Sequence, residues 1–472
     1  MARGILSGEL PAGTRIPSSR RLSKDLAVSR NAVLLAYDQL LAEGYLDSAV
    51  GSGTFVAANL PDDGLPKSRQ RPSSDPAASP HAVSRAAVAA QAAFAQAVGF
   101  RGQAPTYDFQ YGVPNVLDFP HELWRRLLIS AARRRSAKIL AYAHPSGVPE
   151  LREAVARYVR QARAVACSAE NILIVNGSQQ ALDLVARTLC DPGDRVVIEN
   201  PHYSGARNAF SVAGASLVPV PVDRGGLSVE TGEQIVSDAK LIYVTPSHQF
   251  PTGAIMPLAR RIALLNWAEA LGAYVVEDDY DSEFRYLGRP IEAVQALDTK
   301  GRVIYVGTLS KTMFPSFRMG YMVLPTALVE AFCAMKYVND RHSAILQQQA
   351  LAMFLSEGHF ERHVRRSRVR NAARREALIA SLRRHFGDRV QIADENSGLH
   401  LLVWFPDLTA QETPALAQAA EKLGVGVYSV APYFIGDPGG CGLVLGYAAL
   451  EPPGIDAGIA LLRRGWDRVT TQ

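Results

Sequence analysis

The sequence predicts an α/β protein with a small helical N-terminal module, and three observations lead to that class. Short apolar runs rich in β-branched residues alternate with helical patterns from about residue 105 to the end of the 472-residue chain. Residues 1–58 instead combine two short helices with a glycine turn between two strands. Residues 59–104, rich in proline and alanine, are typical of a linker. We therefore expect domains at 1–58 and 105–472.

The composition fits a globular protein. Apolar residues make up 48% of the chain, and neither a run of about eighteen uncharged apolar residues nor a signal segment is present. We expect a cytoplasmic location. The four cysteines have no CxxC or metal-ligand spacing, which agrees with a reducing compartment and predicts no metal site. The net charge of +5 is small, so it permits contact with nucleic acid without implying it.

The first predicted element is a short helix that begins at Ser18. Pro17-Ser18 is a typical helix start with serine as the N-cap, and Leu22 and Leu26 fall four residues apart on one face. The helix lies in a concentrated positive patch in which only Asp25 is acidic. The basic residues of the patch are Arg15, Arg20, Arg21, Lys24 and Arg30.

A second helix is predicted over residues 30–44. Ser29 can cap its start, and Gly44 ends it. Arg30 and Asn31 lie in its first turn and are free to face outward. One apolar stripe is expected to face the core, made of Val33, Tyr37, Leu40 and Leu41.

A hairpin completes the module. The stretch YLDSAVGSGTFVA (45–57) predicts a strand, a turn at Gly51-Ser52-Gly53, and a second strand that begins at Thr54. Helix, turn, helix and hairpin in this order predict a winged helix-turn-helix. In that fold the second helix enters the major groove of double-stranded DNA, and the wing touches the backbone.

Residues 2–57 resemble the GntR-type winged helix. The resemblance implies DNA binding, and the predicted contacts are Arg20, Ser29, Arg30, Asn31, Gly51, Ser52 and Gly53. Two departures stand out. The chain starts inside what should be the first helix, so we expect that a leading segment of the usual domain is missing. Ala32 stands where the family usually has threonine, which removes one possible hydroxyl contact.

The second part of the chain predicts a mostly parallel sheet. Its pattern of strand, helix and strand is seen in ENILIVNG, SQQALDLVARTLCDPGD and RVVIEN, and the runs KLIYVTP, AYVVEDD and RVIYVG follow. Near-continuous apolar strands of this kind favour a sheet covered by helices on both faces. Sites in such sheets lie at the carboxyl ends of the strands.

Polar motifs follow three of these strands. They are NGSQQ with Gly177, Ser178 and Gln179; EDDYD with Asp278 and Tyr280; and GTLSK with Thr308, Ser310 and Lys311. The first motif opens a helix, whose free N–H groups and dipole favour a phosphate. A cofactor with a phosphate, a basic ring nitrogen and an aldehyde would use all three motifs. Pyridoxal 5'-phosphate is that cofactor.

Residues 105–472 resemble the fold-type I aminotransferases, which are PLP-dependent. The shared motifs, in the family order, are YAHPSGVPELR, NGSQQAL, ENPHYSG, PSHQFPTG, EDDYDSEFRY and GTLSKTMFPSFRMGYMVLP. The resemblance implies a large domain with a mostly parallel sheet and a smaller C-terminal α/β subdomain. It makes Lys311 the Schiff-base lysine, Asp278 the partner of the pyridine nitrogen, and Tyr280 a hydrogen-bond donor to the ring hydroxyl.

The same resemblance implies the remaining cofactor contacts. Arg318 would hold the phosphate, and a bidentate guanidinium suits its charge and geometry. Tyr203 would stack on the ring, and Tyr142 matches a tyrosine that reaches the phosphate of the neighbouring subunit. The phosphate site would also include Thr308, Ser310 and the turn Gly177–Gln179.

A GntR-type winged helix joined to an aminotransferase-like domain resembles the MocR subfamily of bacterial regulators over essentially the whole chain. The resemblance implies a transcription regulator that uses its cofactor domain to sense an amine or amino acid. It also implies a head-to-tail homodimer in which each DNA module lies over the other subunit.

Two departures from working aminotransferases favour sensing over turnover. Phe250 stands where they have an asparagine before PTG, although His248 and Gln249 are close enough in sequence to substitute. Val444, in CGLVLGYAAL, stands where they have the arginine that binds the substrate carboxylate. Arg207 is a candidate replacement, and a surface role for it is equally compatible with the sequence.

The basic run at residues 361–386 has two interpretations. It can be an auxiliary DNA contact, or an amphipathic helix with a solvated arginine face and with Val364, Ala372 and Leu378 among the arginines. We favour the helix.

Three functions from different classes stay open at this point. They are a regulator that senses an amine, an active aminotransferase with a DNA-binding appendage, and a DNA-binding protein that has lost its cofactor. The lysine, aspartate and arginine set argues against the last. Effector, operator and the sign of regulation are not encoded in any motif.

Overall fold

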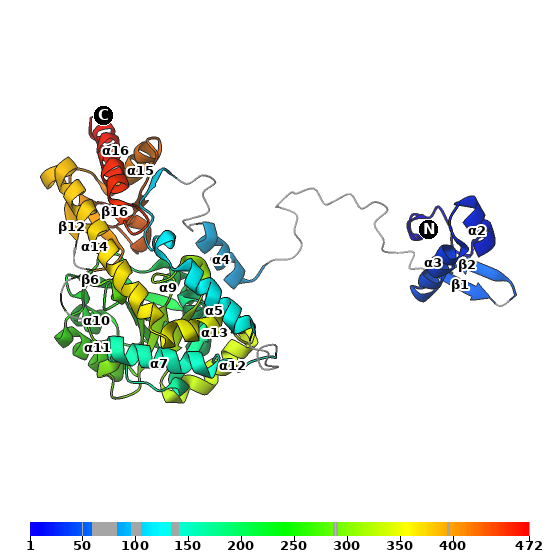
Figure 1. Ribbon diagram of the computed structural model, residues 1–472, viewed down its shortest axis with the longest axis horizontal. Helices are drawn as coiled ribbons and strands as arrows, with labels where there is room; N and C mark the ends of the chain where they lie inside the picture. The colour runs from blue at the N-terminus through cyan, green and yellow to red at the C-terminus, as the bar shows by residue number, and fades with distance from the viewer. Residues whose placement is uncertain are drawn as a thin grey trace. The chain divides into compact units, whose positions relative to one another are not determined.

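The computed structural model describes residues 1–49, 51–58, 83–95, 105–133, 141–286, 288, 291–393 and 397–471. The chain divides into two compact units, Met1–Ala82 and Val83–Gln472 (Figure 1). Of the predicted linker, residues 59–82 and 96–104 lie outside the described residues. Between them, α4 (Arg85–Ala95) is a helix of the second unit that contacts α9 (Ser204–Val212).

The first unit has the order of elements that the sequence predicts. They are α1 (Ala2–Leu6), α2 (Ser19–Asp25), α3 (Arg30–Ala42), β1 (Leu46–Ala49) and β2 (Gly53–Val56). Both predicted N-caps are confirmed: the side chains of Ser18 and Ser29 accept hydrogen bonds from the backbone N–H groups of Arg21 and Ala32. The antiparallel pair of β1 and β2 forms the wing.

The core of the first unit contains the predicted stripe of α3. Val33, Tyr37 and Leu40 are buried, and the Tyr37 hydroxyl donates to the Pro17 carbonyl at 2.7 Å. Leu26 behaves differently from Leu22, because it follows the last residue of α2 and is 60% exposed. The next residue, Ala27, has a left-handed backbone with φ 51°, which turns the chain before Leu26 can join the core.

The second unit is built on an eight-stranded sheet with the order β4-β11-β10-β9-β8-β5-β6-β7. The strands are β4 (Ile172–Val175), β5 (Arg195–Asn200), β6 (Ser216–Asp223), β7 (Gly226–Leu227), β8 (Leu241–Val244), β9 (Tyr274–Asp279), β10 (Val303–Thr308) and β11 (Gly320–Val323). The mostly parallel sheet is confirmed, with β11 antiparallel to both β10 and β4. The connection at residues 309–319 is too short for the crossover that a parallel neighbour needs.

Helices cover both faces of this sheet, because alternate residues of each strand point to opposite sides. On β10, Ile304 packs in the layer of α8, α9 and α12, whereas Tyr305 packs in the layer of α5, α7 and α13. Val303 lies on the α10 and α11 side. The bounds are α5 (His121–Arg133), α7 (Pro149–Arg163), α8 (Ser178–Leu189), α10 (Val229–Ile235), α11 (Leu258–Leu271), α12 (Val329–Asp340) and α13 (Ile345–Ser356).

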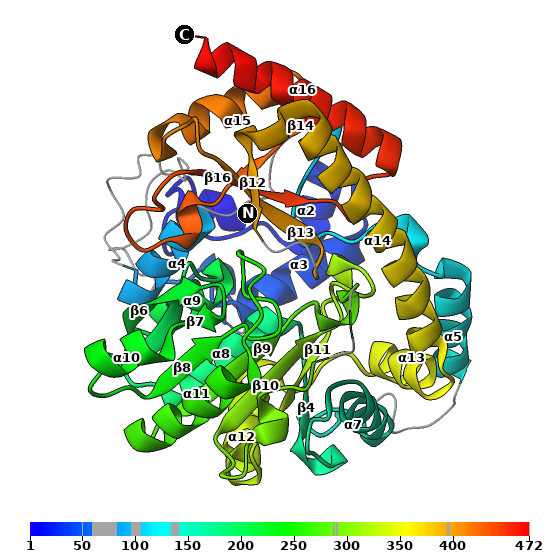
Figure 2. The ribbon, with the colours of Figure 1, turned by 90° about the vertical axis from the view of Figure 1, so that its left-hand side faces the viewer.

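A smaller C-terminal subdomain completes the second unit. Its antiparallel sheet has the order β12-β13-β16-β15, and α15 and α16 pack with one another beside it. The long helix α14 (His359–Phe386) runs from α13 to α16 (Figure 2). The other elements are β3 (Tyr107–Asp108), β12 (Gln391–Ala393), β13 (His400–Phe405), β14 (Val425–Gly426), β15 (Tyr428–Ser429), β16 (Cys441–Gly446), α15 (Thr413–Glu421) and α16 (Pro452–Thr470).

Helix α14 is the basic run of the sequence. Val364 and Leu378 are buried as expected, but the arginine face is not wholly solvated. Arg374 is 2% exposed and donates to Asp118 at 2.8 Å and to Glu451 at 2.5 Å. Part of the basic charge therefore links α14 to the segments that precede α5 and α16. Among the described residues, none of the helices is both long enough and apolar enough to span a bilayer.

Candidate functional site

A cavity of about 140 Å³ opens at the carboxyl ends of β8, β9 and β10 and the N-terminus of α8. This is the edge at which parallel α/β sheets place their ligands. Eight of the predicted site residues line it: Ser178, Tyr203, Asp278, Tyr280, Thr308, Ser310, Lys311 and Arg318.

Lys311 follows β10 and points into this cavity. Its Nζ donates to the carbonyl of Gly112 at 2.8 Å. Burial lowers the pKa of the Lys311 ammonium, while the charges of Asp281 and Asp278 oppose that shift. A lowered pKa makes the neutral, nucleophilic amine more accessible. A Cβ at Gly112 would lie only 2.5 Å from Nζ, so glycine leaves the lysine its space.

Asp278 has one oxygen paired and one not. Oδ2 accepts from the Tyr243 hydroxyl at 2.8 Å, whereas Oδ1 is buried without a partner among the described residues. Burial raises the pKa of Asp278 to about 7, with the Tyr243 hydrogen bond acting in the opposite direction. A cationic N–H donor opposite Oδ1 would restore the carboxylate. The Oγ of Ser310 is likewise buried and without a partner in the part of the chain that is described.

The N-terminus of α8 and Arg318 form a basic cup. Gly177 caps the helix with φ 83°, and a Cβ there would lie 3.0 Å from the Arg318 guanidinium. Arg318 donates to the Asn176 carbonyl at 3.1 Å. Free N–H groups, the helix dipole and a guanidinium together suit a phosphate.

A buried polar network supports this cup from behind. Lys336 is fully buried and donates to both Asp340 oxygens at 2.6 and 2.7 Å. Asp340 also accepts from the Asn176 side chain at 2.6 Å, and Gln180 accepts from the Asn176 N–H at 2.7 Å. The network fixes the turn that precedes α8.

Of the two residues that depart from aminotransferases, Phe250 lines the cavity and Val444 lies in the buried cluster that packs with it. Phe250 packs edge-on to Tyr203, with ring centroids 5.6 Å apart. Val444 lies in β16 opposite Leu402 and is fully buried in the same cluster as Phe250 and Tyr433. Neither of these two side chains can neutralise a carboxylate.

The two neighbours of Phe250 that could substitute for an asparagine lie in different places. Gln249 is turned into the protein, where its Nε2 donates to Glu199 at 3.2 Å and to the Pro201 carbonyl at 2.9 Å. His248 instead contacts the Tyr280 hydroxyl, with Nδ1 at 2.9 Å. Of the two, only His248 reaches the predicted cofactor residues.

Several predicted residues do not line the cavity. Gly177 touches it only through Arg318, and Gln179 is exposed, its Nε2 donating to the Gly205 carbonyl at 3.1 Å. Tyr142 lies on the surface, 81% exposed, beside Arg341. Arg207, the candidate carboxylate partner, is not among the lining residues.

Other cavity residues were missed by the sequence reasoning. Tyr111 and Gly112 come from the start of the second unit, and His400 comes from the C-terminal subdomain. The sequence gives no local signal for them, because they are brought in by tertiary packing. Asp281 had a signal, since it belongs to EDDYD.

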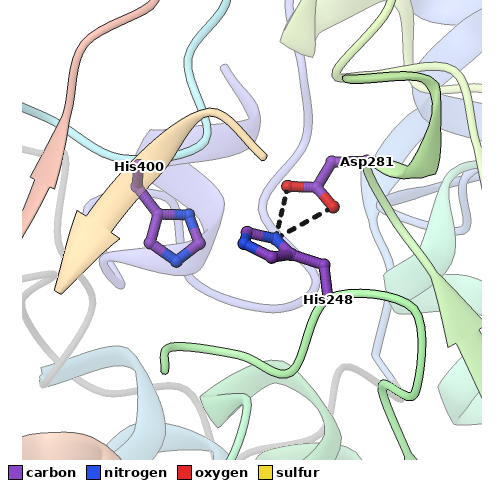
Figure 3. Close-up of side chains that lie close together, drawn as sticks. All are labelled: His248, Asp281 and His400. Atoms are coloured by element: carbon purple, nitrogen blue, oxygen red, sulfur yellow. Dashed lines mark hydrogen bonds and ion pairs between the residues drawn. The ribbon is translucent and has the colours of Figure 1, made fainter. Parts of the chain in front are cut away.

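Two histidines and an aspartate gather at one end of the cavity (Figure 3). His248, Asp281 and His400 are buried, and their ligand-type atoms lie within 4.8 Å of one another. Each histidine already has a protein partner: Asp281 for His248 and the Pro251 carbonyl for His400. The sequence expectation of no metal site stays a prediction.

The predicted DNA contacts lie on one small module and are exposed. Arg20, Ser29, Arg30, Asn31 and the wing turn Gly51–Gly53 all face solvent within the first unit. The Arg30 Nε donates to the Ser19 hydroxyl at 3.4 Å, which links the starts of α2 and α3.

Comparison with known proteins agrees with this division. Residues 2–56 match the family described as bacterial regulatory proteins, gntR family, and residues 115–435 match aminotransferase class I and II. The probable rhizopine catabolism regulatory protein MocR of Rhizobium meliloti is 40% identical over 97% of this chain and 90% of its own. This chain belongs to the MocR subfamily of GntR-type transcription regulators.

Other relatives of this MocR-type regulator have the same layout or share its larger domain. The transcriptional regulator TauR of Rhodobacter capsulatus is 34% identical over 98% of this chain and 94% of its own. The kynurenine aminotransferase of Pyrococcus horikoshii, solved in complex with PMP, is 27% identical with a TM-score of 0.72, over 82% of this chain and 95% of that one. Aminotransferases of this class use pyridoxal phosphate, and GntR regulators bind DNA.

Proposed function

We propose that this MocR-type regulator binds pyridoxal 5'-phosphate in the cavity around Lys311, and that an amine or amino-acid effector acts there to control DNA binding. The observation that carries the proposal is the pair of buried oxygens without described protein partners, Asp278 Oδ1 and Ser310 Oγ, on the cavity that holds Lys311. Buried polar atoms are rarely left unpaired, so a polar ligand is expected opposite them.

The residues around the cavity suit the chemical groups of that cofactor. Lys311 would attach to its aldehyde carbon, Asp278 would keep a proton on its ring nitrogen, and Tyr203 would lie against the ring. The basic cup of Arg318, Ser178 and the α8 N-terminus would take the phosphate, with Thr308 and Ser310 beside it. When bound, the cofactor supplies an electrophilic carbon that amines attack and a ring that withdraws electrons from it.

Sensing is favoured over catalysis by the side chains at the two positions that depart from aminotransferases. An amine needs only Lys311, a protonated ring and access to react, whereas turnover also needs the substrate held in one orientation, which can be worth several powers of ten. Val444 and Phe250 supply neither of the usual contacts. The alternative is an active aminotransferase that uses a 2-oxo-acid acceptor, which the complete set of Lys311, Asp278 and Arg318 would favour.

The assembly we propose is a head-to-tail homodimer. Tyr142 supports it, because this tyrosine is exposed and does not line the cavity of its own subunit. It is thus available to the cavity of a partner.

The first test is the absorption spectrum of the purified protein. The wild type should take up the cofactor and turn yellow, and borohydride should trap the cofactor on Lys311. The variant Lys311→Ala should fold, as judged by circular dichroism, and should lack the trappable cofactor. If the spectrum of the variant were unchanged and still reducible by borohydride, the cofactor would not be attached to Lys311, and this assignment would be wrong.

A further inference from the structure

One ring nitrogen serves two neighbours at the cavity edge. His248 Nδ1 lies 2.9 and 3.1 Å from the two carboxylate oxygens of Asp281 and 2.9 Å from the hydroxyl oxygen of Tyr280. His248 and Asp281 are 3% and 2% exposed, so the contacts are sheltered from water. Figure 3 shows the carboxylate facing this edge of the ring.

The carboxylate decides where the histidine proton resides. An ionised carboxylate can only accept hydrogen bonds, so a bare Nδ1 facing both oxygens would place lone pairs against lone pairs. Asp281 therefore selects the tautomer with the proton on Nδ1. That N–H also faces Tyr280, whose oxygen then accepts. Because its oxygen accepts from His248, Tyr280 is left to donate its own proton elsewhere, and Tyr280 lines the cofactor cavity.

The surroundings keep this arrangement in place. A Cβ at Gly398 would lie 2.0 Å from His248 Cε1, so the ring fits only against glycine. Burial lowers the pKa of His400 to about 3, so this ring, 5.2 Å from His248, stays neutral. The other charged groups that line the cavities around the pair are Arg163, Asp278, Arg285, Lys311 and Arg318.

Phe250 explains why the orientation of the Tyr280 hydroxyl matters, because phenylalanine cannot donate a hydrogen bond to the cofactor. A donor to the ring oxygen of the cofactor favours the anionic oxygen, and aminotransferases share that task between a tyrosine and the asparagine that Phe250 replaces. Gln249 points into the protein, as described above. We propose that Asp281 and His248 act as positioning residues that aim the Tyr280 hydroxyl at the cofactor ring oxygen, in place of the absent asparagine. This inference rests on the proposed cofactor binding.

The test is a double-mutant cycle on the cofactor-loaded protein. The readout is the pH midpoint at which the visible absorption band is lost. Tyr280→Phe removes the donor, so the nitrogen of Lys311 should keep its proton to higher pH and the midpoint should rise by about one unit, the worth of one hydrogen bond. Asp281→Asn removes the ionised acceptor that holds the proton on His248 Nδ1, so the proton can move to Nε2 and the bare Nδ1 then accepts from the Tyr280 hydroxyl, which is drawn away from the cofactor.

The two substitutions should therefore be strongly coupled. Asp281→Asn also removes a negative charge, which alone lowers the midpoint. In the Tyr280→Phe background only that lowering should remain, so the two backgrounds should differ in their response by about one pH unit. Additive shifts, with cofactor bound in all four proteins, would overturn the relay.

A rescue variant tests whether Asp281 and His248 orient the Tyr280 hydroxyl or only stabilise the local structure. Phe250→Asn restores a direct donor, so adding it to Asp281→Asn should lower the midpoint by about one unit and leave only the charge effect seen in the Tyr280→Phe background. A midpoint that does not fall on adding Phe250→Asn would contradict the proposal. A stoichiometric metal ion in the purified protein that is lost with His248→Asn would also overturn it, because His248 would then be a ligand. A wild-type protein that never binds the cofactor would instead refute the proposed function, and this inference with it.

Discussion

The fold places Asp278 at the position where the proposed chemistry needs a carboxylate. Its β9 strand carries it to the sheet edge, Tyr243 satisfies one oxygen, and the other has no described partner. Its pKa is raised to about 7, so the empty folded protein binds a proton that the unfolded chain releases near pH 4. Stability from this group is therefore lost as the pH rises from about 4 to 7.

Asp278→Asn should remove that pH-dependent cost. In the cofactor-free protein the variant should gain stability over the wild type at pH 8, by up to about 4 kcal/mol for a shift of some three units, and only about a third of that at pH 5. Urea unfolding at both pH values measures the gain. Asp223→Asn, an exposed carboxylate paired with Arg260, is the control and should show no gain at pH 8. An equal gain at pH 5 and pH 8 would contradict the account, and cofactor affinity should fall sharply in Asp278→Asn.

Single residues were predictable where chemistry and position share one short motif. Lys311 and Asp278 each follow a strand within a few residues, so local pattern was enough. Gly112 contacts Lys311 across 199 residues of sequence, and no local pattern encodes such a contact. The orientation of Gln249 away from the cavity depends on its contact with Glu199, 50 residues away in the sequence, which no local pattern encodes either.

At the scale of elements, α2 and α3 are expected to divide the work on DNA. Arg30 and Asn31 lie exposed in the first turn of α3, the part that reads bases in helix-turn-helix proteins. Arg20 is exposed on α2, which crosses the backbone in such complexes. The caps at Ser18 and Ser29 that set these helix starts were predictable, because they depend on neighbouring residues. The exposure of Leu26 was not predictable, because no sequence pattern indicates the left-handed backbone of Ala27.

Arg20→Ala should weaken binding to all DNA sequences alike. The slope of log affinity against log salt should fall by about one phosphate contact, because one counterion fewer is released. Arg30→Ala or Asn31→Ala should instead reduce discrimination between operator and unrelated DNA, by about 1–3 kcal/mol for a base contact. Fluorescence anisotropy across a salt series measures both. Arg187→Ala, in a pair with Asp183 on the second unit, is the control; equal effects from this control would contradict the assignment.

At the scale of the whole molecule, the order of the two modules along the chain was predictable. The head-to-tail dimer is a proposal that experiments must test. The motifs fixed a winged helix followed by an α/β domain, because each module carries its own pattern. The antiparallel direction of β11 followed from a short connection that the motif pattern did not mark. Tyr142 does not line the cavity of its own subunit, which is the basis for the proposed head-to-tail dimer.

Tyr142→Ala should lower cofactor affinity about tenfold, the worth of one charge-assisted hydrogen bond to the phosphate. Mixed dimers test which subunit the tyrosine serves. Tyr142→Ala chains mixed with Lys311→Ala chains should form hybrids in which the intact Lys311 receives Tyr142 from its partner, so tight binding should return in about half of the chains. No recovery in hybrids shown to form would place Tyr142 outside the partner's site.

The central claim is that this cavity senses an amine without catalysing full turnover. The most direct measurement is the amount of amino acid formed per subunit when the cofactor-loaded protein meets a panel of amino acids and ω-amines, with 2-oxoglutarate or pyruvate as acceptor. The account predicts that at least one amine changes the visible spectrum and the affinity for operator DNA, while product stays at or below one equivalent per subunit. Many equivalents formed at ordinary enzyme rates, of the order of one per second or faster, would contradict it and identify an active aminotransferase.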